Sequence, residues 1–363
     1  MKTLLHHRSR RLILAVSLAL TACSPLLRMT SATTDTVYAD PAVPQAPAGQ
    51  KEAEPITKST KAASSVTLLE QVSPAIEAGQ YSAITWLGGN RYAVVHDKLN
   101  GGGIVFFDID MQPATGAIGR VSVTIPDATR LSGATGMDNE GIAYANGKLF
   151  VSAEYDQSIR EYELDGTPTG RLLSIPEEFR RNRISGNAGF EALTFNAVTG
   201  LFWTTTEGPL KADKATPLLH RLQSFGANLQ PAGQYLYQMD EPLKSAEGTR
   251  AYVHGISAMT ALDDGRLVVL EREVYVPSSI LRALTDTFSA VKLYVVHPGG
   301  KNGTLLPKTL LASFNTTMAD LANYEGMCLG PTLTDGRHTL LLIADSQGGM
   351  SGLTNEYLKV IIF

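Results

Sequence analysis

Acidic residues recur at two matching positions along this sequence of 363 residues. One set stands at the start of short apolar runs and consists of Glu140, Glu191 and Glu325. The other set ends the apolar run that follows and consists of Glu154, Glu207, Glu271 and Asp345. Carboxylates that converge in one place can bind a hard cation or transfer protons, so these residues are the first candidates for chemistry.

The spacing between the two positions is nearly constant. Three pairs are 14 residues apart: Ser82 and His96, Glu140 and Glu154, and Ser257 and Glu271. Two further pairs are 16 and 20 residues apart: Glu191 with Glu207, and Glu325 with Asp345. A turn containing Gly, Asn or Asp separates the members of each pair, so each pair is typical of two antiparallel strands joined by a hairpin.

A third apolar run, and in most units a fourth, follows each hairpin. Four short antiparallel strands per unit, repeated along residues 65–363, predict a β-propeller with an all-β fold. We count five blades, or six if two units have been merged, and a two-sheet sandwich is the alternative. The last unit lacks a fourth strand because the chain stops at Phe363, and residues 65–72 are predicted to supply it and close the ring. A short helical excursion is expected at residues 281–288.

The propeller architecture predicts where the acidic residues meet. First strands line the central channel, and the end of each second strand lies beside the start of the first. The predicted metal ligands at this mouth are Glu140, Glu154, Glu191, Glu207, Glu325 and Asp345, with His96 and Asp97 nearby. Crowded carboxylates repel one another, so either Ca²⁺ or nearby Arg and Lys must offset them. Ser82 and Ser257 leave the acidic ring incomplete, and capping of turns is the alternative role for the carboxylates.

Basic residues are expected at the same mouth. Arg181, Arg183 and Arg272, together with His96, are candidates for binding an anionic substrate group. Arg250 and His254 are placed in a loop that leads into a first strand, and His254 is a candidate general base. The sequence lacks the nucleophile elbow, the phosphate-binding loop and the zinc-binding H-E-x-x-H pattern. A net charge of −4 argues against a nucleic-acid partner.

The N-terminus has the features of an export signal. Residues 1–22 combine basic residues with an apolar stretch too short to span a bilayer, and their last three residues form Leu20-Thr21-Ala22-Cys23 with the next one. This ending resembles the bacterial lipoprotein box, which implies acylation of Cys23 and, with Ser24 next, an outer-membrane location. The alternative is an ordinary secretory signal with a chance cysteine. Residues 23–64 are rich in Ala, Pro, Ser, Thr, Lys and Glu and have almost no aromatic residues, so they are predicted to be a disordered tether, leaving 65–363 as the folded domain.

Several segments resemble one bacterial family. They are residues 138–142 (DNEGI), 189–194 (GFEALT), 271–273 (ERE), 323–327 (NYEGM) and 339–347 (TLLLIADSQ). Over residues 70–363 the chain is similar to the phytase-like family, or "esterase-like activity of phytase" domains. The resemblance implies a propeller-like domain that hydrolyses esters or phosphoesters with calcium. By position, the family's characteristic glutamates correspond to Glu140, Glu191, Glu271 and Glu325.

These observations support one leading hypothesis and two alternatives. The leading one is a Ca²⁺-assisted esterase or phosphoesterase that acts on a small anionic substrate outside the cytoplasm. Phytate itself is less favoured, because six phosphates demand more Lys and Arg than this mouth offers. The alternatives are a non-catalytic envelope lipoprotein that binds or scaffolds a partner, and a calcium-dependent lactonase.

Overall fold

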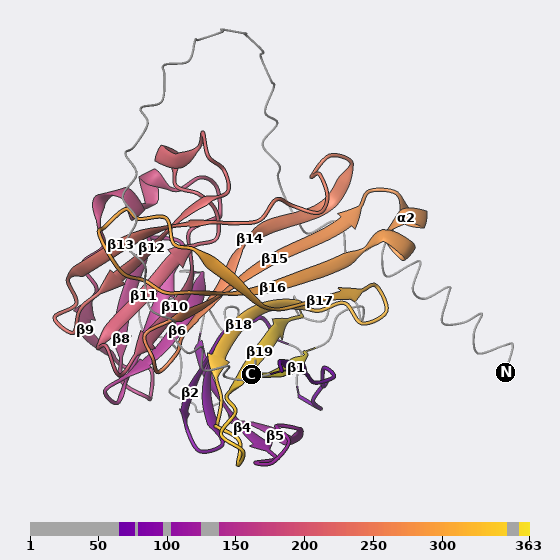
Figure 1. Ribbon diagram of the computed structural model, residues 1–363, viewed down its shortest axis with the longest axis horizontal. Coiled ribbons are helices and arrows are strands. Elements are labelled where there is room, and N and C mark those ends of the chain that lie inside the picture. The colour runs from indigo at the N-terminus through magenta and orange to yellow at the C-terminus, as the bar shows by residue number, and fades with distance from the viewer. Residues whose placement is uncertain (1–64, 77–78, 97–102, 125–137, 347–355) are drawn as a thin grey trace, which may run out of the picture.

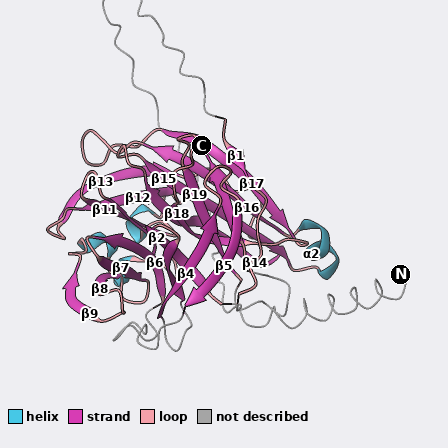
Figure 2. Cartoon of the chain, turned by 90° about the horizontal axis from the view of Figure 1, so that it is seen from below, coloured by secondary structure: helices cyan, strands magenta, loops and turns pink. Residues whose placement is uncertain are grey.

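The computed structural model describes residues 65–76, 79–96, 103–124, 138–346 and 356–363. In these residues nearly every regular element is a β-strand, and the strands form five antiparallel sheets of four strands each (Figure 1). These sheets are the blades of a β-propeller, so the predicted fold and the count of five are confirmed. Figure 2 shows how little of the molecule is helical.

The first three blades each use four consecutive strands. Those of the first blade are β2 (Tyr81–Gly88), β3 (Arg91–His96), β4 (Gly103–Met111) and β5 (Ile118–Thr124). Those of the second are β6 (Asn139–Ala145), β7 (Lys148–Ala153), β8 (Ser158–Tyr162) and β9 (Pro168–Leu172). Those of the third are β10 (Phe190–Asn196), β11 (Leu201–Thr206), β12 (Leu219–Phe225) and β13 (Pro231–Gln238). Three short 3-10 helices flank the third blade: η1 (Glu177–Phe179), η2 (Arg181–Arg183) and η3 (Lys211–Asp213).

The fourth blade is longer than the others. Its strands are β14 (Thr249–Ala261), β15 (Leu267–Pro277), β16 (Phe288–Val296) and β17 (Lys308–Thr317). Figure 1 shows them reaching outward to α2 (Ile280–Asp286), which is the predicted helical excursion. Arg250 and His254 lie within β14 and not in a loop, because the β14–β15 ladder continues beyond the channel.

The fifth blade closes the ring. It contains β18 (Asn323–Leu329), β19 (Thr339–Asp345), β20 (Leu358–Ile362) and the N-terminal β1 (Thr67–Leu68). Thr67 pairs with Ile362, and Val72 forms a further bridge with Leu358. The predicted closure by residues 65–72 is therefore confirmed, and it covers an edge strand that would otherwise be open.

The core is divided among the blades. Five clusters of buried apolar side chains each lie between two consecutive blades, including the fifth and the first. Both faces of a blade are thus covered, which explains the continuous apolar run in β19. Each fully buried side chain of this kind contributes about 1.5–3 kcal/mol. Cys328 lies in the cluster between the fifth and first blades, as expected for a small buried apolar residue.

Several sequence predictions concern other parts of the chain. The signal peptide (1–22), the acylated Cys23, the tether (23–64) and Asp97 lie outside the described residues. Within the described residues, the helices are too short or too polar to cross a membrane.

Candidate functional site

The five inner strands share one irregularity. In β2, β6, β10, β14 and β18, the pairing with the next strand skips one residue, which defines a β-bulge. The skipped residues are Ser82, Glu140, Glu191, Ser257 and Glu325. A bulge releases its residue from the ladder and re-aims the side chain. We call these five residues the bulge ring, and they include the three glutamates predicted at the starts of first strands.

The residue after each bulge is always small. These residues are Ala83, Gly141, Ala192, Ala258 and Gly326. A Cβ added to Gly141 would lie 2.5 Å from the Ser152 hydroxyl and 2.8 Å from the carbonyl oxygen of Glu191. Neighbouring inner strands therefore approach so closely that two blades require glycine, and this packing fixes the level of the bulge ring.

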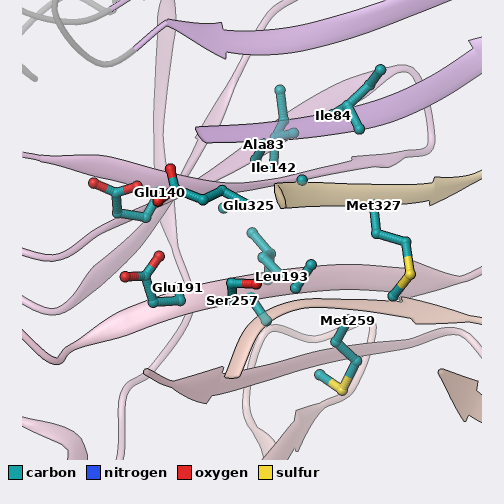
Figure 3. A pocket seen from close by; sticks show the side chains of 14 residues that line it. Ala83, Ile84, Glu140, Ile142, Glu191, Leu193, Ser257, Met259, Glu325 and Met327 are labelled. Atoms are coloured by element: carbon teal, nitrogen blue, oxygen red, sulfur yellow. The ribbon is translucent and has the colours of Figure 1, made fainter. Parts of the chain in front are cut away.

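A ring of large apolar side chains lies one step deeper in the channel. It consists of Ile84, Ile142, Leu193, Met259 and Met327. Figure 3 shows the carboxylates of Glu140, Glu191 and Glu325 to one side of the two methionines. The cavity between the two rings has a volume of about 10 Å³, roughly the room of one water molecule. The apolar ring therefore closes the channel beneath the carboxylates and shields them from solvent on that side.

The ends of the second strands form a second ring at this mouth. In the second to fifth blades one such residue lies opposite the residue two positions before the bulge residue, and the first-blade counterpart, Asp97, lies outside the described residues. These residues are Glu154, Glu207, Arg272 and Asp345, and we call them the outer ring. The position equivalent to Glu154 is thus Arg272, not Glu271, although Glu271 is the residue 14 positions after Ser257.

Glu271 points away from the channel because neighbouring strand residues face opposite sides. Its carboxylate accepts hydrogen bonds from the Tyr237 hydroxyl at 2.6 Å and from the Asp240 backbone N–H at 3.1 Å. It also pairs with Lys308 Nζ at 2.6 Å. These contacts connect the third and fourth blades and separate Glu271 from the other predicted glutamates.

Arg272 occupies the centre of one side of the mouth. Its side chain is 3 % exposed and forms ion pairs with Glu207 at 2.6 Å and with Glu325 at 2.5 Å. Arg272 also donates to Asn323 Oδ1 at 3.0 Å, and Asn323 Nδ2 donates to Glu325 at 2.7 Å. This guanidinium, predicted to bind substrate, therefore holds carboxylates from the third and fifth blades.

Burial dominates the electrostatics of this side. It raises the pKa of Glu191 well above its ordinary value, and the charges of Glu140 and Glu207 raise it further. Burial also raises the pKa of Glu207, whereas Arg272 lowers it. For Arg272, burial lowers the pKa, but the charges of Glu325, Glu207 and Glu191 outweigh burial and raise it overall. The arginine therefore stays charged, and Glu191 favours its protonated form.

Three carboxylates form an acidic triad on the other side of the mouth. Asp138, Glu140 and Glu154 each offer an oxygen within 4.8 Å of the others. Glu154 is 2 % exposed and accepts a hydrogen bond from the Gly189 backbone N–H at 2.5 Å. Burial raises the pKa of Glu154 to about 7, the Gly189 hydrogen bond opposes this shift, and the charges of Glu207 and Asp138 add to it.

The two predicted histidines lie at different places. His96 ends β3, where its ring meets the edge of Tyr81 with centroids 5.1 Å apart. His254 is half-buried in β14 opposite Glu273, and it lines a small cavity with Glu241 and Arg272. Burial lowers the pKa of His254, while Glu273 raises it. His254 therefore lies behind Arg272 and outside the cavity that the bulge ring lines.

Arg181 and Arg183 lie in η2, in the connection that leads into β10. Arg181 donates to the Gly186 carbonyl at 2.7 Å, and Arg183 approaches Glu177 at 3.6 Å. Both side chains are exposed, and neither lines the cavity of the bulge ring. The structure thus places them on the surface at the mouth end of the third blade.

Sequence reasoning missed two contributors. Asp138 belongs to the acidic triad, and Asn323 connects Arg272 with Glu325. Both stand two residues before a bulge-ring glutamate, so the repeat contained a signal for them. The predicted set of metal ligands is also divided: Glu140 and Glu154 belong to the triad, whereas Glu207 and Glu325 bind Arg272. Asp345 lies opposite Asn323.

A protein family matches most of the chain. The family described as "Phytase-like: Esterase-like activity of phytase" matches residues 76–347. No curated protein matches the chain.

Similar solved structures include three enzymes. An endo-arabinase from Bacteroides thetaiotaomicron VPI-5482 has a TM-score of 0.41 at 11 % identity, covering 81 % of this chain and 98 % of that one. A β-xylosidase, RS223, has a TM-score of 0.43 at 10 % identity, with coverages of 81 % and 94 %. A glutaminyl cyclase from Myxococcus xanthus has a TM-score of 0.38 at 10 % identity, with coverages of 82 % and 97 %.

Proposed function

Because this chain belongs to the phytase-like family, we propose that it hydrolyses small anionic esters or phosphate esters with the help of a bound Ca²⁺ ion. The observation that carries this proposal is the acidic triad at the channel mouth. Asp138, Glu140 and Glu154 bring carboxylate oxygens within 4.8 Å of one another above a closed apolar floor.

The triad fits a hard cation. Its donors are all carboxylate oxygens, which Ca²⁺ prefers, and backbone carbonyls and waters commonly complete its shell of six to eight ligands. The donors are also held in place: Glu140 by its bulge, and Glu154 by the Gly189 N–H. When bound, the cation would polarise an ester or phosphoryl oxygen and lower the pKa of a water molecule.

The remaining residues of the mouth have separate roles in this proposal. Glu191 lies beside Glu140, and its raised pKa keeps a proton on the carboxyl group that it can donate to a leaving oxygen. Arg272 is a positioning residue, because both of its Nη atoms are used to hold Glu207 and Glu325. The exposed Arg181 and Arg183 would attract an anionic substrate over a longer range.

Calorimetric titration of Ca²⁺ into the chelator-stripped protein tests the proposal. Turnover of p-nitrophenyl acetate, p-nitrophenyl phosphate and an aromatic lactone would be measured in parallel. We expect saturable binding and calcium-dependent turnover of an ester or phosphate, both lost in Glu140→Gln. Glu163→Gln is the matched control, since Glu163 pairs with Lys148 on the surface of the second blade.

The other outcomes separate the alternatives. Turnover of the lactone alone would favour a calcium-dependent lactonase. Absence of both binding and turnover at high protein concentration would refute the hydrolase and favour a non-catalytic binding or scaffold protein. Turnover that persists unchanged in chelator would refute the role of the cation.

The cellular location is a separate part of the proposal. The lipoprotein box at residues 20–23 supports an envelope protein that is anchored through acylated Cys23. Metabolic labelling with a fatty acid, followed by membrane fractionation, tests this anchor. Wild-type protein should incorporate the label and sediment with membranes, whereas Cys23→Ser should lose both properties.

A further inference from the structure

The channel has a second cavity on the far side of the apolar ring. It has a volume of about 210 Å³, much larger than the space beneath the carboxylates. Every residue that lines it belongs to the described part of the chain, and the lining comes from all five inner strands and their adjoining turns. Its floor is the same apolar ring, including Ile84, Leu193 and Met327.

The wall of this cavity is a third ring of side chains. The residues four positions after the bulge residues are Trp86, Tyr144, Phe195, Ala261 and Leu329. Three consecutive blades thus contribute aromatic rings, whereas the fourth blade contributes only a methyl group. The small Ala261 leaves room opposite the aromatic side chains, so this third ring surrounds a much larger cavity than the one beside the apolar ring.

The aromatic wall is held in place from behind. Trp86 Nε1 donates to the Gly89 carbonyl at 2.9 Å, and the Phe195 ring packs on Phe202 with centroids 4.6 Å apart. Thr194 accepts a hydrogen bond from the Ala261 backbone N–H at 3.1 Å, which fixes the third blade against the fourth. The three aromatic side chains nevertheless remain partly exposed. A preformed concave surface with exposed aromatic rings is typical of a ligand site.

The charge of the cavity selects the kind of ligand. Among its lining residues, Asp263 supplies the one carboxylate, and no Lys, Arg or His contributes. Aromatic faces carry negative electrostatic potential, so the rings and the carboxylate favour the same sign of ligand charge. The cavity therefore disfavours anions, in contrast to the substrate proposed for the opposite mouth.

We propose that this aromatic cavity is a second binding site, which takes a small organic cation with an apolar body, such as a quaternary ammonium compound. The apolar ring separates it from the carboxylates, so its ligand and the hydrolytic substrate occupy different ends of the channel. The inference rests on the cavity alone and does not depend on the proposed hydrolase activity.

The two tryptophans of the chain provide a direct test. Trp86 lines the cavity, whereas Trp203 is buried between the third and fourth blades. In the full chain carrying Trp203→Phe, the remaining fluorescence therefore reports on Trp86. We expect benzyltrimethylammonium to change this fluorescence saturably, and benzoate, an anion of similar shape, to bind at least about tenfold more weakly.

Variants locate the binding site. Tyr144→Ala should weaken benzyltrimethylammonium binding about fivefold or more through loss of a cation–π contact, and Ala261→Leu should abolish binding by filling the cavity. Glu140→Gln at the other mouth should leave binding unchanged. If Trp203→Phe or Ala261→Leu does not fold, calorimetry on the wild-type protein and Tyr144→Ala gives the same comparison. Lack of saturable binding, equal binding of benzoate, or loss of binding in Glu140→Gln would overturn the proposal.

Discussion

The two sides of the acidic mouth use similar residues in different ways. On one side, Arg272 holds Glu207 and Glu325 at hydrogen-bonding distance and connects three blades. On the other side, Glu154 lies against Asp138 and Glu140, and its pKa is raised to about 7. The first arrangement is a buried ion-pair network, and the second is a cluster of oxygen donors. The same repeated glutamate can therefore pair with an arginine in one blade and join a cluster of carboxylates in another.

A single position explains this difference. The outer ring has a carboxylate in the second and third blades but a guanidinium in the fourth. Glu154 meets Gly189, where an added Cβ would lie 2.7 Å from Glu154 Cγ, whereas Arg272 meets Asn323. The next blade thus presents a residue that matches the outer-ring side chain. Beside Glu154 this residue is a glycine, which leaves room for packing, and beside Arg272 it is an asparagine, whose amide forms a hydrogen bond.

Removal of the Arg272 guanidinium should have the largest effect, because it takes away the group that distinguishes the two sides of the mouth. Arg272→Met leaves the carboxylates of Glu207 and Glu325 buried without their ion-pair partner. We expect the free energy of unfolding to fall by about 3–5 kcal/mol, measured by urea denaturation. Arg337→Met is the control, because its pair with Asp335 lies at the surface, is partly exposed and contributes at most about 1 kcal/mol.

A triple variant checks the cause of that loss. Replacing Glu207 and Glu325 by Gln in the Arg272→Met background removes the buried charges and should restore part of the stability. Equal losses in Arg272→Met and Arg337→Met would show that the network does not stabilise the fold.

Glu356 is a further buried carboxyl near the mouth, and among the described residues it is held by hydrogen-bond donors without an arginine partner. Glu356 accepts from the Gly79 N–H at 2.6 Å and from the Ser346 hydroxyl, and burial raises its pKa to about 7. Between about pH 4.5 and 7 the folded protein therefore binds more protons than the unfolded chain. The free energy of unfolding should fall by up to about 3 kcal/mol as pH rises through this window.

Denaturation curves at several pH values measure this slope. Glu356→Gln should be flatter between pH 4.5 and 7 than the wild type, whereas Glu163→Gln should keep the wild-type slope. A slope that is identical in all three proteins would rule out Glu356 as its source.

Inner strands approach one another closely on both sides of the mouth. A variant that adds one methyl group between two of these strands tests how tightly they must pack. Gly141→Ala places a Cβ against Ser152 and the Glu191 carbonyl, so we expect a loss of about 1–3 kcal/mol in thermal or urea unfolding. Gly299→Ala is the matched control, because no atom lies within 4 Å of its added Cβ. A harmless Gly141→Ala would mean that the bulge ring tolerates wider spacing.

The smallest expected effect is on Ca²⁺ affinity, and it compares the acidic triad directly with the Arg272 side of the mouth. Glu154→Gln keeps an oxygen that can accept from Gly189 but removes one charge from the triad. We expect Ca²⁺ affinity to fall about tenfold, or about 1.4 kcal/mol, in calorimetry. Glu207→Gln, on the arginine side, should change Ca²⁺ affinity less. The reverse order would place the cation on the Arg272 side.

The sequence by itself predicted the architecture well. Four apolar runs per unit, repeated five times, are a local signal, because alternating burial and turn residues are set by neighbours in the chain. The missing last strand even predicted closure by residues 65–72, which β1 confirms. The recurrence of Glu140, Glu191 and Glu325 likewise predicted that these side chains lie near one mouth of the channel.

Tertiary structure decided what the repeat could not. Equal spacing made Glu271 the counterpart of Glu154, but the turn between β14 and β15 is longer than that between β6 and β7, so Arg272 takes that position. A shift of one residue reverses the face of a strand side chain. Whether a carboxylate meets an arginine, a glycine or another carboxylate depends on the adjacent blade, and that contact joins residues far apart in the sequence.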